Sequence, residues 1–390
     1  MTSLIIDEPY FPSPLKYAKR RKLSGNIFCQ GKVVTKKEVL NKGPQTWNVL
    51  DSWKPGWVLD SIAIDEHRVV IIEYEKTVKM FDSYKRSWTK LPRLPRDLEG
   101  ELSSVLFQGF LYILVVDELL SSIWRLNVET LDEWEEITQK YSQRTGCASV
   151  AGDQNLYVSG GQYLEDPYFR SQETLGNFVR YNSISNTWTN LPCMKYERRD
   201  HETARVKENI YILGGKSIEH GKPLTSMEVF HTRTQVWKTA PKMPITFLKL
   251  SSVVLRSRWI VVVGTRLDGM SHCIIYDTRI NVWFNAIEFV LNLSIPRVLL
   301  QGEKQIVIVG QNDDEHFSLK AIDFHSLHPW FSIGHMITIR RLIDTDRATV
   351  NKTIGKRDER IIQKLVTDTN DDVYRRVLSF LISNPKVSLV

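Results

Sequence analysis

The sequence contains few features of a secreted, membrane-spanning or cysteine-dependent protein. Its four cysteines lie tens of residues apart and form no C-x-x-C pair, which argues against a zinc site or a redox pair: Cys29, Cys147, Cys193 and Cys273. No apolar run reaches the roughly 20 residues of a membrane-spanning helix. The N-terminus also lacks the basic and apolar regions of a secretory signal. These absences predict a reduced, cytoplasmic protein that does not enter a membrane.

Most of the chain carries almost no net charge. Residues 1–24 contain five basic and two acidic side chains, residues 346–390 contain nine and six, and residues 25–345 contain 38 and 37. A near-neutral body does not indicate a nucleic-acid-binding face. The basic cluster at Lys19, Arg20, Arg21 and Lys22 has two interpretations: a solvated arm, which we favour, or a nuclear-import signal.

Patterns typical of catalysis or metal binding are also missing. No glycine-rich, phosphate-binding loop leads into a helix. The acidic segment 313–316 lacks the alternating ligand spacing of a calcium loop. His325, His328 and His335 show no metal-ligand spacing with paired carboxylates. We therefore expect no cofactor, no metal ion and no catalytic residue.

What the sequence does contain is a repeat marked by tryptophan. Seven indoles recur at intervals of 41 to 54 residues: Trp47, Trp88, Trp134, Trp188, Trp237, Trp283 and Trp330. An apolar, usually aromatic residue precedes each by six to eight positions, with a polar turn between them, which predicts a β-hairpin. Before most of these hairpins lies a run rich in Val and Ile, such as residues 69–74, which predicts a buried strand. Four short strands per repeat predict a β-propeller.

These units resemble kelch repeats. The resemblance depends on an apolar strand, a glycine pair, and then an aromatic residue and a tryptophan at fixed spacing. Gly160–Gly161 and Gly214–Gly215 match the glycine pair fully, whereas other units retain one glycine or none. The resemblance covers about residues 25–345 and implies an all-β propeller. It leaves the function open, because kelch propellers include enzymes, cytoskeletal binders and substrate receptors of ubiquitin ligases.

If each tryptophan marks one blade, the propeller has seven four-stranded antiparallel blades. We expect segment 335–344 to supply the first strand of a blade whose other three strands come from the N-terminal unit. The alternative is six blades, with residues 25–50 as an accessory. Outside the propeller, we predict a poorly ordered basic arm at 1–24 and short helices at 346–390.

The strand order places the loops after second strands and the loops between blades on one face. The candidate residues for partner binding combine aromatic side chains of loop 162–176 with arginines of the blade-joining loops: Tyr163, Tyr168, Phe169, Arg170, Arg144, Arg198, Arg199 and Arg297. Arginines beside aromatic rings suit an acidic peptide. The competing explanation is that these arginines form structural pairs with neighbours such as Asp200.

We therefore predict a monomeric propeller that binds a partner protein or an acidic peptide on its loops. One alternative is a small-molecule enzyme, similar to mutarotases of the kelch type, at the mouth of the central channel. The other is a substrate adaptor of a ubiquitin ligase, although we expect no BTB or F-box domain in this chain.

Overall fold

The structure, a computed structural model, describes the chain in segments. These are residues 27–29, 32–34, 48–53, 58–74, 77–95, 102–116, 121–137, 144–164, 172–219, 221–279, 281–285, 294–302, 305–311 and 316–323. All regular elements in these segments are strands, and none of the described residues forms a helix long and apolar enough to span a membrane. The arm predicted at 1–24, the segment 335–344 and the helices predicted at 346–390 lie outside the described residues.

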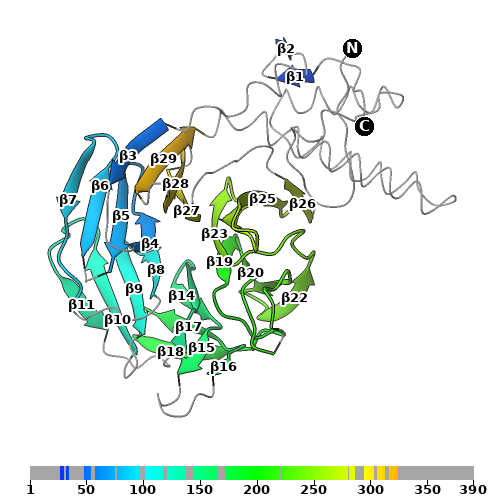
Figure 1. Cartoon of the computed structure of the whole chain (residues 1–390). Helices are drawn as coiled ribbons and strands as arrows, with labels where there is room; N and C mark the ends of the chain where they lie inside the picture. The colour runs from blue at the N-terminus through cyan, green and yellow to red at the C-terminus, as the bar shows by residue number, and fades with distance from the viewer. Residues whose placement is uncertain are drawn as a thin grey trace.

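Six four-stranded antiparallel sheets form the blades of a propeller (Figure 1). Blade 1 consists of β4 (Val58–Ala63), β5 (Arg68–Glu73), β6 (Val78–Asp82) and β7 (Ser87–Lys90). Blade 2 consists of β8 (Leu102–Phe107), β9 (Phe110–Val116), β10 (Ser121–Asn127) and β11 (Trp134–Ile137). Blade 3 consists of β13 (Ala148–Ala151), β14 (Asn155–Ser159), β17 (Phe178–Asn182) and β18 (Thr187–Leu191).

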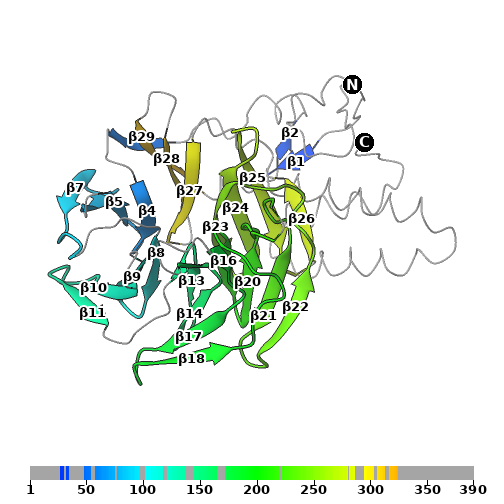
Figure 2. The same cartoon turned by 60° about the horizontal axis from the view of Figure 1, so that its bottom comes forward.

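Blades 4 to 6 repeat this arrangement. Blade 4 consists of β19 (Glu202–Val206), β20 (Asn209–Leu213), β21 (Met227–His231) and β22 (Val236–Ala240). Figure 2 shows β20, β21 and β22 side by side. Blade 5 consists of β23 (Lys249–Leu255), β24 (Trp259–Thr265), β25 (Ser271–Asp277) and β26 (Val282–Asn285). Blade 6 consists of β27 (Ser294–Gln301), β28 (Gln305–Gln311), β29 (Phe317–Asp323) and, as its fourth strand, β3 (Asn48–Trp53).

Two smaller sheets accompany the blades. A hairpin joins β1 (Ile27–Cys29) to β2 (Lys32–Val34). A three-stranded sheet contains β12 (Arg144–Thr145), β15 (Gln162–Leu164) and β16 (Gln172–Thr174). Part of the long loop after the second strand of blade 3 is therefore ordered as a β-ribbon.

The prediction of seven blades is wrong, because the described residues form six. β3 pairs antiparallel with β29, with Leu319 opposite Asp51 and Phe317 opposite Trp53. Contacts between the first strands then pass from blade to blade, including β27 with β4, so the ring is closed. The alternative of six blades has the right number, but it assigned residues 48–50 to an accessory, and these residues belong to β3 in blade 6. Counting one blade per tryptophan failed because β3, from the first repeat, and β27 to β29, from the last, form a single blade.

The hairpins predicted from the aromatic–tryptophan spacing are confirmed in five blades. Tyr181 lies directly opposite Trp188, with ring centroids 5.1 Å apart, and Tyr276 lies opposite Trp283 at 4.9 Å. Equivalent pairs are Phe81–Trp88, Leu126–Trp134 and Phe230–Trp237. Because the side chains on one face of paired strands meet across the ladder, the fixed spacing in sequence becomes a packed pair.

Three of these indoles also link neighbouring blades. Each donates its ring N–H to the carbonyl of the proline that lies four residues after the preceding repeat's tryptophan. The bonds are Trp134 to Pro92 (2.9 Å), Trp237 to Pro192 (2.7 Å) and Trp283 to Pro241 (2.9 Å). The same tryptophan therefore packs within its own blade and fixes the loop from the previous one.

Candidate functional site

The propeller has two faces with different connections. Loops after second strands and loops between blades lie on one side, which we call the loop face. The tight turns after first and third strands lie on the other, which we call the turn face. This division follows from the antiparallel order of strands within each blade. The central channel runs between the two faces, and we consider all three regions as candidate sites.

Two of the predicted partner-binding arginines are buried. Arg198 is fully buried, forms an ion pair with Glu228 at 2.7 Å, and donates to the carbonyls of Gly214 (2.6 Å) and Ser226 (3.2 Å). Burial lowers the pKa of Arg198, while Glu228 opposes that shift. Its guanidinium therefore fixes the loops of blade 4 and does not reach a partner on the surface.

Arg144 has the equivalent role one repeat earlier. Only 2% of its surface is exposed, and its Nη1 donates to the carbonyl of Gly160 (3.2 Å). Both arginines lie 16 residues before the first glycine of a glycine pair. This shared offset is visible in the sequence, but only the structure shows that both side chains are buried. Their burial corrects their assignment to the partner-binding surface.

The other six predicted residues have four different placements. Arg199 lies on the loop face with its side chain 33% exposed, 4.0 Å from Asp200. Arg297 lines the channel, where it pairs with Asp60 at 2.7 Å. Tyr163 lies in β15 with its backbone opposite Glu173. The remaining three, Tyr168, Phe169 and Arg170, lie outside the described residues.

The loop face also exposes apolar side chains that the sequence analysis did not select. Ile218 is 47% exposed in the loop after β20, and Leu267 (65%) and Met270 (58%) are exposed in the loop after β24. These two loops belong to neighbouring blades 4 and 5. The Ile218 N–H donates to Thr174 Oγ of the neighbouring small sheet (3.1 Å), which fixes its loop. Their sequence signal was apolar residues inside polar loops.

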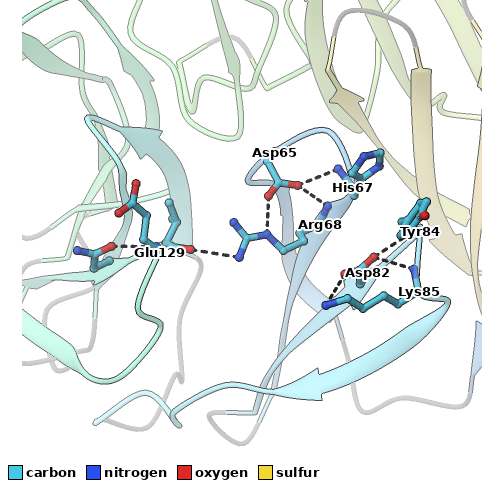
Figure 3. Close-up of polar contacts among 9 residues, drawn as sticks. Asp65, His67, Arg68, Asp82, Tyr84, Lys85 and Glu129 are labelled. Carbon is cyan, nitrogen blue, oxygen red and sulfur yellow. Dashed lines mark hydrogen bonds and ion pairs between the residues drawn. The ribbon is translucent and has the colours of Figure 1, made fainter.

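Polar side chains of the turn face are occupied by local structure. In blade 1, Asp82 Oδ1 accepts the N–H groups of Tyr84 (3.0 Å) and Lys85 (2.9 Å), and Asp65 accepts those of His67 and Arg68 (Figure 3). Hydrogen bonding from Lys85 lowers the pKa of Asp82. Burial opposes the shift at Asp65, yet the hydrogen bonds and the charge of Arg68 lower its pKa.

The same turn chemistry recurs in later blades. Asn182 caps the turn of blade 3 by accepting the N–H groups of Ile184 (3.0 Å) and Ser185 (2.9 Å), and Asp277 accepts that of Arg279 (3.0 Å). Asp and Asn favour such turns because their short side chains bind the backbone two residues on. These residues therefore explain the polar turn between the aromatic residue and the tryptophan, and they are not binding candidates.

The central channel is a cavity of about 500 Å³. It is lined by residues on or directly before the first strands of all six blades. Hydrogen bonds between neighbouring first strands form a belt around it, which we call the inner belt. The bonds are Ser104–Asp60 (2.7 Å), Ser103–Ser149 (2.7 Å), Thr203–Ser149 carbonyl (3.0 Å), Ser252–Glu202 (3.5 Å), Ser251–Val298 N–H (3.1 Å) and Arg297–Asp60 (2.7 Å).

Two titratable groups of the channel have altered pKa values. Burial raises the pKa of Glu202 to about 8, and Asp60 adds to the shift while Arg297 opposes it. Burial lowers the pKa of His201 to about 3, and the charge of Arg198 acts in the same direction. At neutral pH both side chains are therefore uncharged. Among the described residues, no group of three or more His, Cys, Asp or Glu side chains is placed to hold a metal ion.

Comparisons with known proteins agree with this geometry. The Kelch motif family model matches residues 143–195 and 197–244, which correspond to blades 3 and 4. Kelch-like protein terF of Aspergillus terreus is 23% identical over 256 residues, covering 61% of this chain and 55% of that protein. An F-box/kelch-repeat protein of Arabidopsis thaliana is 28% identical over 213 residues, covering 52% and 49%. The matched regions span 33% to 55% of the length of such relatives.

A solved structure shares the fold. The structure of YjhT matches 69% of this chain and 95% of its own, with a TM-score of 0.56 and 12% identity. The closed ring of six four-stranded blades defines a β-propeller. With the glycine pairs, the aromatic–tryptophan hairpins and the matching motifs, the chain is a kelch-repeat β-propeller.

Proposed function

We propose that this propeller is a protein-binding module and that its partner docks on the loop face of blades 4 and 5. The observation that carries the proposal is the exposure of Ile218, Leu267 and Met270 in the loops after the second strands of these two blades. Single exposed apolar residues are normal on a soluble protein. Three on two neighbouring loops of one face are typical of a docking site.

Basic side chains accompany these apolar residues. Arg199 and Lys216 both lie near Asp200, at 4.0 and 3.1 Å, so the three together carry one positive charge. Arg266 is 37% exposed and pairs with Asp268 at 3.2 Å. A partner segment that combines apolar anchors with a carboxylate fits this surface, because Arg and Lys form charge-assisted hydrogen bonds with carboxylates.

The turn face is the weaker candidate. Its two most exposed apolar side chains, Tyr84 and Ile184, are each 81% exposed but belong to blades 1 and 3, which are not neighbours. Its turns are capped by their own Asp and Asn side chains. The turn face therefore supplies a matched control for a test of the loop face.

The experiment compares captured partners between variants of the full chain. Leu267→Asp and Ile218→Asp place a charge on the proposed surface, and Ile184→Asp makes the same change on the turn face. All three positions are exposed, so stability should change by less than about 0.5 kcal/mol. We expect quantitative mass spectrometry to show the same partner depleted by both loop-face variants and retained by Ile184→Asp. Equal capture by all variants would exclude the loop face.

The same capture experiment distinguishes the adaptor role. Several relatives are named F-box/kelch-repeat proteins or a kelch repeat and BTB domain-containing protein. If the chain serves a ubiquitin ligase as a substrate adaptor, ligase subunits should accompany the partner in the wild-type sample. If the partner is captured without them, the module binds its partner for another purpose.

A further inference from the structure

We propose that the central channel binds a neutral small molecule rich in hydroxyl groups, held between Ser61 of blade 1 and His201 of blade 4. This site is separate from the protein-binding surface proposed above, because Ile218, Leu267 and Met270 are not among the residues that line the channel. A cavity of about 500 Å³ falls within the range of roughly 300–1,000 Å³ that is typical of small-molecule sites.

Two buried polar atoms in the channel wall point to a ligand. Ser61 and His201 each line the channel and are each only 5% exposed. Ser61 Oγ and His201 Nδ1 make no hydrogen bond with any group of the described residues. Buried polar groups in native proteins are almost always hydrogen-bonded, so these two require an explanation.

The ring places the two atoms on opposite walls. Contacts between first strands define the order of the blades around the axis, and in a closed ring of six, blade 4 is opposite blade 1. A molecule that spans the channel would therefore contact Ser61 from one side and His201 from the other. The inner belt provides further hydroxyl groups between them, including those of Ser103 and Ser252.

The hydrogen bonds of His201 define what the ligand must offer. Its Nε2 lies 2.7 Å from Ser159 Oγ, and that hydroxyl donates to the Ala148 carbonyl at 3.4 Å. Ser159 therefore accepts a hydrogen bond from Nε2–H, which leaves Nδ1 as an acceptor. The hydroxyl of Ser61 can donate and accept. A ligand with one hydroxyl group near each wall can satisfy both atoms, because a hydroxyl group both donates and accepts hydrogen bonds.

The charges of the channel favour a neutral ligand. Arg297 pairs with Asp60, and Asp200 at the loop-face end pairs with Lys216. Burial raises the pKa of Glu202 to about 8, and a ligand carboxylate buried beside it would meet the same desolvation cost. A cation would meet Arg297 and Lys249, which both line the channel. An anionic or cationic molecule of the same shape should therefore bind more weakly.

The test uses sugars that share one ring and differ in charge. Saturation-transfer NMR on the full chain compares glucose and other neutral hexoses and hexitols with glucuronate and glucosamine. We expect a neutral compound to bind at least about tenfold more tightly than its charged analogues. Ser61→Ala should weaken binding by several-fold, whereas Ser185→Ala, the same change on the turn face, should not. Leu267→Asp, on the separate protein-binding surface, should also leave the affinity for the sugar unchanged.

A second variant separates the roles of the two histidine nitrogens. His201→Gln keeps an N–H donor near Ser159 and removes the acceptor at Nδ1, so it should weaken binding while the protein stays folded. If no neutral compound gives saturation transfer, or if the charged analogues bind as well, the channel contains water alone and the proposal fails. It also fails if Ser61→Ala and His201→Gln both bind like wild type.

The pH profile of binding gives an independent readout. Glu202 faces Arg297 of β27, Asp60 of β4 and Ser252 of β23, and it accepts a hydrogen bond from the Thr203 backbone. When Glu202 loses its proton, the channel gains a negative charge and loses a donor, so the affinity for a neutral ligand should fall as the pH rises through about 8. In Glu202→Gln the affinity should not change over this range. If the affinity of Glu202→Gln still fell with pH as in wild type, Glu202 would not belong to the binding site.

Discussion

Arg198 and Glu228 form an ion pair that is closed to solvent, with 2.7 Å between Nη2 and Oε1 and side-chain exposures of 0% and 2%. Glu228 also accepts the backbone N–H groups of Lys195 (2.8 Å) and Tyr196 (3.1 Å). The pair therefore joins the loop that enters blade 4 to the third strand of that blade. Arg199, the next residue, is one-third exposed and lies 4.0 Å from Asp200.

These neighbouring arginines should respond very differently to mutation. Arg198→Met leaves Glu228 charged, buried and without its cation, so the free energy of unfolding should fall by about 3–5 kcal/mol. Arg199→Met removes a surface interaction and should cost less than about 1 kcal/mol. Urea denaturation of both variants measures the difference. Equal losses would mean that the buried pair has no special structural role.

Closure of the ring between blades 6 and 1 depends on Trp53. Its ring lies 4.9 Å from that of Trp88 in blade 1 and 6.1 Å from that of Phe317, and its Nε1 donates to Glu73 (3.2 Å). Trp53→Ala should lower the free energy of unfolding by about 2–4 kcal/mol, at or below the range for a fully buried tryptophan. Val49→Ala, at a position 55% exposed in the same strand, should cost less than about 0.5 kcal/mol. If both variants unfolded at similar midpoint temperatures, the closure of the ring would not depend on Trp53.

Glycine at the start of the motif pair is required by both conformation and space. Gly160 has a φ of +54°, and a Cβ there would lie 2.3 Å from the Arg198 carbonyl oxygen. Gly160→Ala should therefore destabilise the protein by at least about 3 kcal/mol. Gly109 has a φ of +77° with no atom within 4 Å of the added Cβ, so Gly109→Ala should cost only about 1–2 kcal/mol. Chemical denaturation that ranks the two in the opposite order would contradict this explanation.

Stability should depend on pH through Glu202. Its pKa is about 8 in the folded protein and near 4.5 in the unfolded chain, so the folded state binds more protons between these values. The contribution of Glu202 to stability is therefore fully present below about pH 4.5 and is lost as the pH rises through about 8. Glu202→Gln should match wild type near pH 4 and exceed it by about 2–4 kcal/mol at pH 9, since one pKa unit corresponds to about 1.4 kcal/mol. A variant that is less stable than wild type at pH 9 would contradict the sign.

Much of the fold could be predicted because its signals are local. The seven-position spacing of Tyr181 and Trp188 predicts a hairpin, since a turn of a few residues brings the two rings together wherever the blade lies. The Val and Ile run of β5 predicts a strand buried on both faces, and Val69 to Ile72 are indeed each 0% exposed. The six blades, in contrast, depend on the pairing of Asp51 with Leu319, across most of the chain.

The candidate sites were predicted less well for a related reason. A sequence shows that Arg198 and Arg199 are adjacent and equally basic, but it does not show that one lies inside the blade and the other outside. The channel was expected only as a property of propellers. Its inner belt brings together Asp60, Ser104 and Arg297 from three first strands. No local pattern in the sequence places these side chains together.

The sequence by itself determined the strands and the hairpins, because each depends on residues less than about ten positions apart, and the recurrence of this local pattern defines the repeat. The tertiary structure alone decided the number of blades, the burial of Arg144 and Arg198, and the composition of the channel wall. Those properties arise from neighbours tens to hundreds of residues away, and the energy of burying a charge or leaving a polar atom without a partner is set by these distant neighbours.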